Sequence, residues 1–161
     1  MAKAPKQHKQ VGADYLATAE QGSVKHSFPF PAKLVWNALL DPVAWTEWLP
    51  ITKVTWDGEP PYQAGTTRTV MIGDMAVEET FFIWEEGKRM AFRFERSPFP
   101  ISAAVEDYIV VDKGETCEMH WSGKASGFPL GFLVSGQLKK GLKEGMPKLE
   151  ALIAKDPARF S

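Results

Sequence analysis

The sequence predicts an α+β fold in which a curved antiparallel sheet packs against one long C-terminal helix. Two observations carry this prediction. Residues 66–123 alternate between apolar and polar side chains in segments separated by short turns, which is typical of consecutive hairpins. Residues 129–155 repeat valine and leucine at helical spacing, so one face of a long helix is apolar. A sheet and a helix of this kind bury their apolar faces by packing together.

The composition is that of an ordinary globular domain. The 161 residues are 44% apolar and 24% charged, with a formal net charge of -1, so we expect no nucleic-acid partner. The single cysteine, Cys117, excludes an intrachain disulfide and favours a cytoplasmic location. No apolar run approaches the roughly 20 residues that span a bilayer, so we expect no integral membrane contact. The composition does not predict an oligomeric state.

The chain is expected to begin with a disordered, mildly basic tail over residues 1–22, followed by a single domain over residues 23–161. Prolines end the first strand and each of the two short helices after it. The elements expected before the hairpins are a strand (23–28), a helix (32–42), a second helix (43–49), a strand (51–56) and a loop (57–65).

Two tight turns set the register of the next strands. Gly73 and Asp74 form a two-residue turn that places Arg68 opposite Glu79. A second turn at residues 86–87 places Phe81 opposite Phe92. The inner face then carries Val70, Ile72, Val77, Phe81, Ile83, Met90, Phe92 and Phe94.

The last hairpin is expected to turn through a three-residue loop that contains Gly114. This register places Asp107 opposite Trp121 on the inner face, and it sends Glu106, Tyr108 and His120 outward. The other residues expected on the inner face are Val105, Ile109, Val111, Cys117 and Met119.

The C-terminal helix presents an apolar face to this sheet. That face is carried by Val134, Leu138, Leu142, Leu149 and Leu152, while glycines and Pro147 make the helix less regular. A strongly curved sheet cannot be filled by one helix alone. We therefore expect an internal cavity between the two.

The sequence resembles the START / Bet v 1-like helix-grip superfamily, and within it the polyketide cyclase/dehydratase-like branch also called SRPBCC. The resemblance covers about residues 23–154. It rests on "PAKLVWNALLDPVAWTEWLP", "AGTTRTV", "VEETFFIWEEGKRMAFRF" and "CEMHWSGKAS". The family pattern is a tryptophan in the short helices, Gly-x-x-Arg at the third strand, a glutamate on the fourth strand and a tryptophan late in the last strand. Here it is matched by Trp48, Gly65 with Arg68, Glu79 and Trp121.

The resemblance implies a helix-grip fold with a cavity, one end of which the two short helices close. Trp45 and Trp48, three residues apart, would form its wall or gate, while Trp36 would pack under the sheet. The alternative is that all three rings belong to the core. The same fold hosts binders, carriers and cyclases, so it does not fix a function.

Arg68 and Glu79 are the most specific candidates for chemistry. A charged pair on an apolar face points to recognition of a polar group on an otherwise apolar ligand, or to a partly wet salt bridge with no role. Asp107 could add a polar contact or lie in water at a strand end. His120 is expected on the surface, and Cys117 as a small core residue. Three scattered histidines and one cysteine offer no metal spacing, so we expect no metal and no cofactor.

The function that these observations favour is binding of a hydrophobic small molecule, such as a lipid, an aromatic or a polyketide-like compound. The alternative is a cyclase- or dehydratase-like enzyme in which Arg68 stabilises a developing enolate and Glu79 transfers a proton. A chaperone-associated or membrane-lipid module is a third, weaker hypothesis. The expected ligand-binding residues are Trp45, Trp48, Arg68, Val70, Glu79, Phe81, Phe92, Phe94, Asp107, Met119, Trp121, Leu138 and Leu142.

Overall fold

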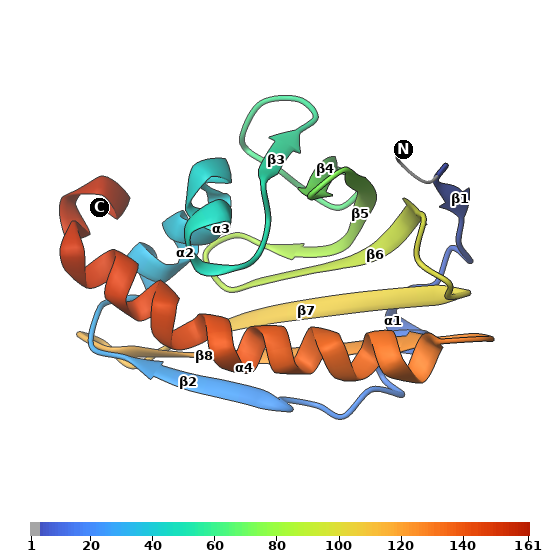
Figure 1. The fold of residues 1–161 in the computed structure, drawn as a ribbon. Helices are drawn as coiled ribbons and strands as arrows, with labels where there is room; N and C mark the ends of the chain where they lie inside the picture. Colours follow the sequence, from blue (N-terminus) through green and yellow to red (C-terminus); the bar gives the residue numbers. More distant parts are fainter. Residues whose placement is uncertain (1–3) are drawn as a thin grey trace.

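The computed structural model describes residues 4–161 as an antiparallel sheet that curves around one long helix (Figure 1). The strands within these residues are β1 (Lys6–Gln7), β2 (Val24–Phe28), β3 (Lys53–Trp56), β4 (Thr67–Ile72), β5 (Met75–Glu85), β6 (Arg89–Ser97), β7 (Ala103–Asp112) and β8 (Cys117–Ser126). The helices are α1 (Ala13–Leu16), α2 (Ala32–Leu40), α3 (Pro42–Trp48), α4 (Gly131–Lys155) and the short 3-10 helix η1 (Pro157–Phe160). This is the α+β architecture that the sequence predicts.

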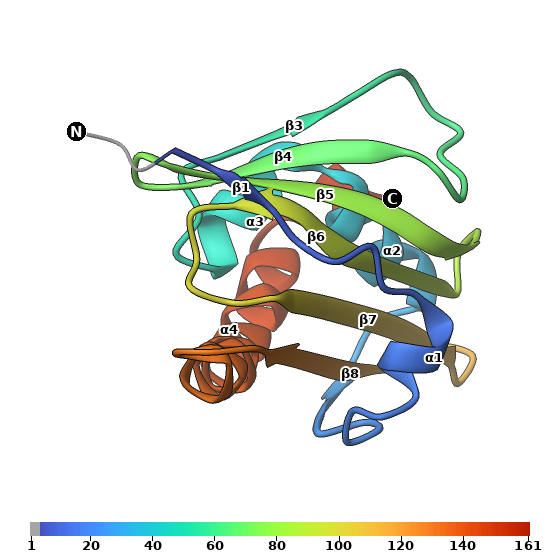
Figure 2. The same cartoon turned by 90° about the vertical axis from the view of Figure 1, so that its right-hand side faces the viewer.

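The strands lie in the order β2-β8-β7-β6-β5-β4-β3, and β1 pairs with β6 off this path. Figure 2 shows the sheet bending from β8 to β3, with α4, α2 and α3 on its concave side and β1 and α1 crossing its outer side. No helix within the described residues is long and apolar enough to span a bilayer.

The two short helices are separated by a cap that the sequence encodes directly. Asp41 ends α2 in an extended conformation, and its carboxylate accepts hydrogen bonds from the backbone N–H groups of Val43 and Ala44. Pro42 occupies the first turn of α3, where its missing N–H costs nothing. The sharp change of direction lets both helices bury apolar faces against the same end of the sheet.

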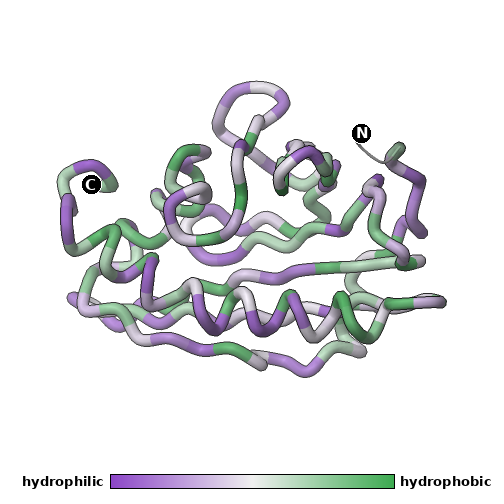
Figure 3. Tube along the Cα trace, viewed as in Figure 1, coloured by the Kyte–Doolittle hydropathy of each residue, from purple (hydrophilic) through white to green (hydrophobic). Residues whose placement is uncertain are grey.

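Helix α4 continues through Pro147 without interruption and lies across the concave face of the sheet. Apolar and polar colours alternate along it in Figure 3. Gly145 is needed where α4 crosses α3: a Cβ at this position would lie 2.9 Å from the carbonyl oxygen of Trp48. The residues of α4 that are buried are Gly131, Val134, Leu142, Gly145, Met146, Leu149 and Ile153.

The prediction that residues 1–22 form a disordered tail is wrong for residues 4–22, which contain β1 and α1. Residues 1–3 lie outside the described range. Leu16 is buried on the outer face of the sheet against Ala91 and Val105. The buried His8 Nε2 lies 2.6 Å from the Oγ of Ser97. The prediction failed because a four-residue helix gives too short a pattern to recognise.

The register predicted for β4 and β5 is confirmed. Arg68 lies opposite Glu79, and the tight turn follows at residues 73–74. The pairing of β5 with β6 is also confirmed at Phe81 and Phe92, but a register shift follows between Phe81 and Ile83. Ile83 therefore lies opposite Ala91 and packs on the outer face, not on the inner face as predicted.

The register predicted for β7 is wrong by one residue. The loop before β8 has four residues, because Asp112 pairs with Cys117. The extra residue reverses every side chain of β7. Glu106 and Tyr108 thereby take the inner face, and Asp107 moves to the outer face. Val105, Ile109 and Val111 alternate with Glu106, Tyr108 and Val110 and therefore lie on the outer face as well, while the prediction for Met119 and Trp121 holds.

Candidate functional site

A cavity of about 300 Å³ lies between the concave face of the sheet and α4. Its walls come from β4 to β7, from the end of α3 and the turn after it, and from the first half of α4. The lining residues are Trp45, Leu49, Pro50, Ile51, Arg68, Val70, Ile72, Met75, Val77, Glu79, Phe92, Phe94, Phe99, Glu106, Tyr108, Val134, Gln137, Leu138, Gly141 and Leu142. The cavity expected from the curvature of the sheet is therefore present.

Many of the residues predicted for the site line this cavity, and the others do not. The predicted residues that line it are Trp45, Arg68, Val70, Glu79, Phe92, Phe94, Leu138 and Leu142. Those outside the lining are Trp48, Phe81, Asp107, Met119 and Trp121.

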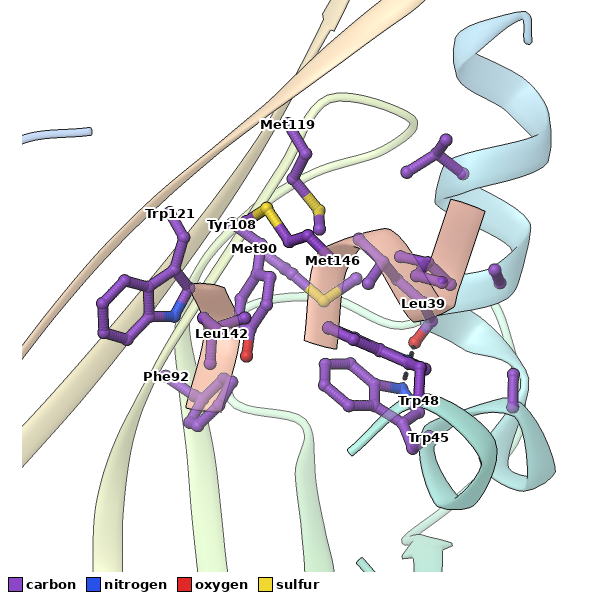
Figure 4. Close-up of a cluster of buried hydrophobic side chains, with 14 of the residues drawn as sticks. Leu39, Trp45, Trp48, Met90, Phe92, Tyr108, Met119, Trp121, Leu142 and Met146 are labelled. Carbon is purple, nitrogen blue, oxygen red and sulfur yellow. Dashed lines mark hydrogen bonds between the residues drawn. The ribbon is translucent and has the colours of Figure 1, made fainter. Parts of the chain in front are cut away.

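The two tryptophans of α3 have different positions. Trp45 lines the cavity, and its Nε1 donates a hydrogen bond of 2.8 Å to the carbonyl oxygen of Leu39. Trp48 packs behind it, with ring centroids 5.1 Å apart, and belongs to the core cluster around Leu142 and Met146 (Figure 4). The sequence left both roles open, and the structure assigns a wall position to Trp45 alone.

Arg68 and Glu79 form a buried ion pair at the inner end of the cavity. The Arg68 Nε donates a 2.6 Å hydrogen bond to the Glu79 Oε1, and the two side chains are only 1% and 5% exposed. The partly wet salt bridge that the sequence left open is thereby excluded. The pair lies directly across two neighbouring strands, as predicted.

Aromatic rings enclose the Arg68 guanidinium. Its central carbon lies 4.5 Å from the ring centroid of Trp45 and 4.9 Å from that of Phe92. The ring centroids of Trp56 and Phe81 lie 5.1 Å and 5.2 Å from the same atom. Such contacts are favourable for a desolvated cation. The Nη1 atom is buried and has no hydrogen-bond partner within the described residues.

Glu106 is a second buried carboxylate at this end, and sequence analysis missed it. Its Oε1 accepts hydrogen bonds from the hydroxyl of Tyr108 (2.8 Å) and from the Nε1 of Trp121 (3.1 Å). All three side chains are buried. The one-residue error in the register of β7 hid Glu106, because it sent this side chain outward.

Burial changes the protonation of these carboxyl groups. Desolvation raises the pKa of Glu79 to about 7; the Arg68 guanidinium opposes this rise and the negative charge of Glu106 adds to it. Desolvation also raises the pKa of Glu106, against the hydrogen bonds from Tyr108 and Trp121. The inner end of the cavity therefore holds one carboxyl group, that of Glu79, that can exchange a proton near neutral pH.

Asp107 does not belong to the site. It lies on the outer face, where the Arg89 guanidinium binds it through two hydrogen bonds of 3.0 Å each. Both alternatives that the sequence left open, a cavity contact and a wet strand end, are wrong: the Asp107 side chain is fully buried against Arg89.

The more exposed lining residues of the cavity are uncharged and, apart from Gln137, apolar. Pro50, Ile51, Met75, Phe99 and Gln137 line it and are partly or fully exposed. Sequence analysis missed these residues because they come from turns and from helix positions next to solvent.

The other residues singled out from the sequence contribute no chemistry here. Cys117 is buried, and desolvation raises the pKa of its thiol to about 11, so it is not an activated nucleophile. His120 faces outward, as predicted, and lies 2.9 Å from the Glu118 carboxylate.

Similar structures share this fold at low sequence identity. XoxI from Bacillus cereus superposes with a TM-score of 0.66 at 14% identity, over 87% of this chain and 97% of that protein. Ara h 8.0201 also superposes with a TM-score of 0.66 at 14% identity, over 86% of this chain and 98% of that protein. DynU16, a protein in the dynemicin biosynthetic locus, gives 0.62 at 20% identity, over 83% of this chain and 46% of that one. These likenesses confirm the predicted helix-grip fold.

Sequence comparisons identify the family. A protein of Mycobacterium tuberculosis strain H37Rv, Rv2574, described as uncharacterized, is 44% identical over 91 residues. That match covers 55% of this chain and 54% of the relative, so it spans about half the length of the curated relatives. The family model described as "Polyketide cyclase / dehydrase and lipid transport" matches residues 21–154. The chain therefore belongs to this family, in agreement with the resemblance seen in its sequence.

Proposed function

We propose that the protein binds a hydrophobic small molecule in the cavity between the sheet and α4, with a polar group of that molecule at the Arg68–Glu79 pair. The observation that carries this proposal is a cavity whose walls are apolar except at one buried end. Membership of a family that includes lipid transport proteins supports it. Small-molecule sites commonly combine apolar walls with a few fixed polar groups in this way.

The position of the ion pair supports the same proposal. A buried pair adds little stability over apolar residues of the same size, so stability alone does not account for Arg68 and Glu79 at the end of a cavity. A ligand oxygen beside the guanidinium would find a cation that aromatic rings already shield from water.

Binding is tested with N-phenyl-1-naphthylamine, an uncharged dye whose fluorescence rises in apolar surroundings. The parent protein is compared with Leu138→Trp, which fills the cavity from α4, and with Leu133→Trp, an exposed position of the same helix. We expect the parent and Leu133→Trp to bind alike and Leu138→Trp to bind at least about tenfold more weakly. Equal binding by all three proteins would place the dye elsewhere and contradict the proposal.

A second candidate function is a cyclase- or dehydratase-like activity on a polyketide-type substrate. The observation that favours it is the pKa of Glu79, about 7, which suits a general acid or base beside a fixed cation. The test is incubation with a synthetic poly-β-carbonyl compound, followed by mass spectrometry for loss of water. Turnover by the parent but not by Glu79→Gln, with dye binding retained, supports the enzyme; no turnover by the parent leaves the binding protein.

A further inference from the structure

We propose that the cavity selects uncharged apolar molecules that carry a hydroxyl group, and rejects carboxylates and phosphates of the same size. This inference rests on the proposed function, because it assigns a ligand class to the same cavity. It is drawn from the charges and hydrogen bonds at the inner end of the cavity.

The lining of the cavity has no surplus positive charge. Its charged residues are Arg68, Glu79 and Glu106, so two carboxyl groups accompany one guanidinium. Arginine stays protonated in proteins, and the ionised Glu79 carboxylate neutralises it at 2.6 Å. An anionic ligand would therefore enter a buried site without a free counter-charge, and burying an unpaired charge is very costly.

The hydrogen bonds at this end favour a hydroxyl group. Within residues 4–161, the side-chain hydrogen bonds to Glu79 and Glu106 reach only the Oε1 atom of each carboxylate. The Oε2 atoms remain acceptors on two residues that line the cavity, and Arg68 Nη1 is a donor without a partner. A hydroxyl both donates and accepts, whereas an ionised carboxylate or phosphate oxygen only accepts.

The rest of the lining limits the remainder of the ligand. Val70, Phe92, Phe94 and Leu142 line the same cavity as the charged groups and offer no side-chain hydrogen bond. A volume of about 300 Å³ suits a compact ring system or a short chain more than a two-chain lipid. The ligand class is thus a small apolar alcohol or phenol.

The test compares two probes that share one ring system. At pH 8, above the pKa of about 7 of Glu79, 2-naphthol is uncharged and 2-naphthoate is an anion, and both are titrated into the full chain by isothermal calorimetry. We expect 2-naphthol to bind at least about tenfold more tightly, since a tenfold ratio needs only about 1.4 kcal/mol of discrimination. Competition with N-phenyl-1-naphthylamine shows that the probes occupy the same site.

Matched variants then test whether the carboxylates set this preference. Glu79→Gln combined with Glu106→Gln leaves Arg68 as an unpaired cation, so the preference should reverse toward 2-naphthoate. Glu78→Gln combined with Glu118→Gln removes the same charge from the outer face and should keep the preference of the parent. If both double variants prefer the same probe to the same degree, the role given to the carboxylates is overturned.

The comparison of 2-naphthol with 2-naphthoate on the parent protein tests the proposed ligand class even where a variant does not fold. If 2-naphthoate binds as tightly as 2-naphthol, or if only the dye binds, the ligand class is wrong and the proposed function stands. If neither the probes nor the dye bind, the proposed function fails and the inference fails with it.

Discussion

Two ion pairs on opposite faces of the same sheet show how surroundings give similar side chains different roles. Arg68 and Glu79 lie on the concave face, 1% and 5% exposed, and face a cavity. Arg89 and Asp107 lie on the outer face, where Arg89 is 28% exposed and binds Asp107 through two hydrogen bonds. In the outer pair both Asp107 oxygens accept a hydrogen bond from Arg89, whereas the inner pair leaves a donor, Arg68 Nη1, and an acceptor, Glu79 Oε2, for another molecule.

The largest effect is expected from removing the inner cation. Arg68→Met leaves Glu79 buried beside Glu106 without a counter-charge, so the pKa of Glu79 should rise further. We expect a loss of about 3–5 kcal/mol in the free energy of unfolding, measured in urea. Combining it with Glu79→Leu should recover much of that loss, and purely additive effects would show that the two side chains do not interact.

The next effect is a dependence of stability on pH. Because the folded protein raises the pKa of Glu79 from 4.5 to about 7, it holds a proton between these values that the unfolded chain has released. Stability contributed by this group should therefore fall as the pH rises through this window, by up to about 3 kcal/mol.

Urea unfolding of the parent, Glu79→Gln and Glu78→Gln across this pH range isolates the contribution of Glu79. Glu79→Gln should flatten the curve, while Glu78→Gln, an exposed neighbour on the same strand, should follow the parent. A flat curve for the parent would contradict the raised pKa of Glu79.

A smaller effect is expected from the outer pair. Arg89→Met leaves the Asp107 carboxylate without its partner, but Arg89 is partly exposed and its removal gives water access to that carboxylate. We expect a loss of about 1–3 kcal/mol in urea, below that for Arg68→Met, and unchanged dye binding. A larger loss than that of Arg68→Met would reverse the comparison between the two faces.

The smallest effect is spectroscopic. Trp45 lines the cavity and Trp48 lies behind it, so a bound apolar molecule should change the emission of Trp45 more than that of Trp48. The ligand for this test is decanol, which has no fluorescent ring of its own. Trp45→Phe should remove most of the change in tryptophan fluorescence on binding, and Trp48→Phe should retain it. The opposite result would return Trp48 to the wall of the cavity.

The two hairpins explain how much of the site the sequence could predict. In β4 and β5 the Gly73–Asp74 turn allows only one register, and the pairing of Arg68 with Glu79 followed from it. In β7 both faces are buried, because the N-terminal segment covers the outer face near Val105. Alternation then carries no information about which side is inward, and the length of the loop before β8 could not be read from one glycine.

The misplaced N-terminal segment and the misplaced Glu106 thus have a common cause. Leu16 covers the outer face of β7, which is why that face is apolar. Because the N-terminal segment was expected to be a free tail, nothing in the prediction covered the outer face of β7, and a strand with two buried faces was not expected. The fold itself was predictable because it depends on the order of the elements and on the apolar face of α4, which single errors of register do not alter.

The most direct test of the account is a side-chain NMR titration that observes both arginines at once. The Nε–H resonances of Arg68 and Arg89 are followed in ¹⁵N-labelled protein while 2-naphthol is added. We expect the Arg68 resonance to shift and saturate with the binding isotherm, while the Arg89 resonance stays in place. A saturating titration that leaves Arg68 unmoved, or that moves Arg89 as much, would contradict the claim that the ligand binds at the inner ion pair.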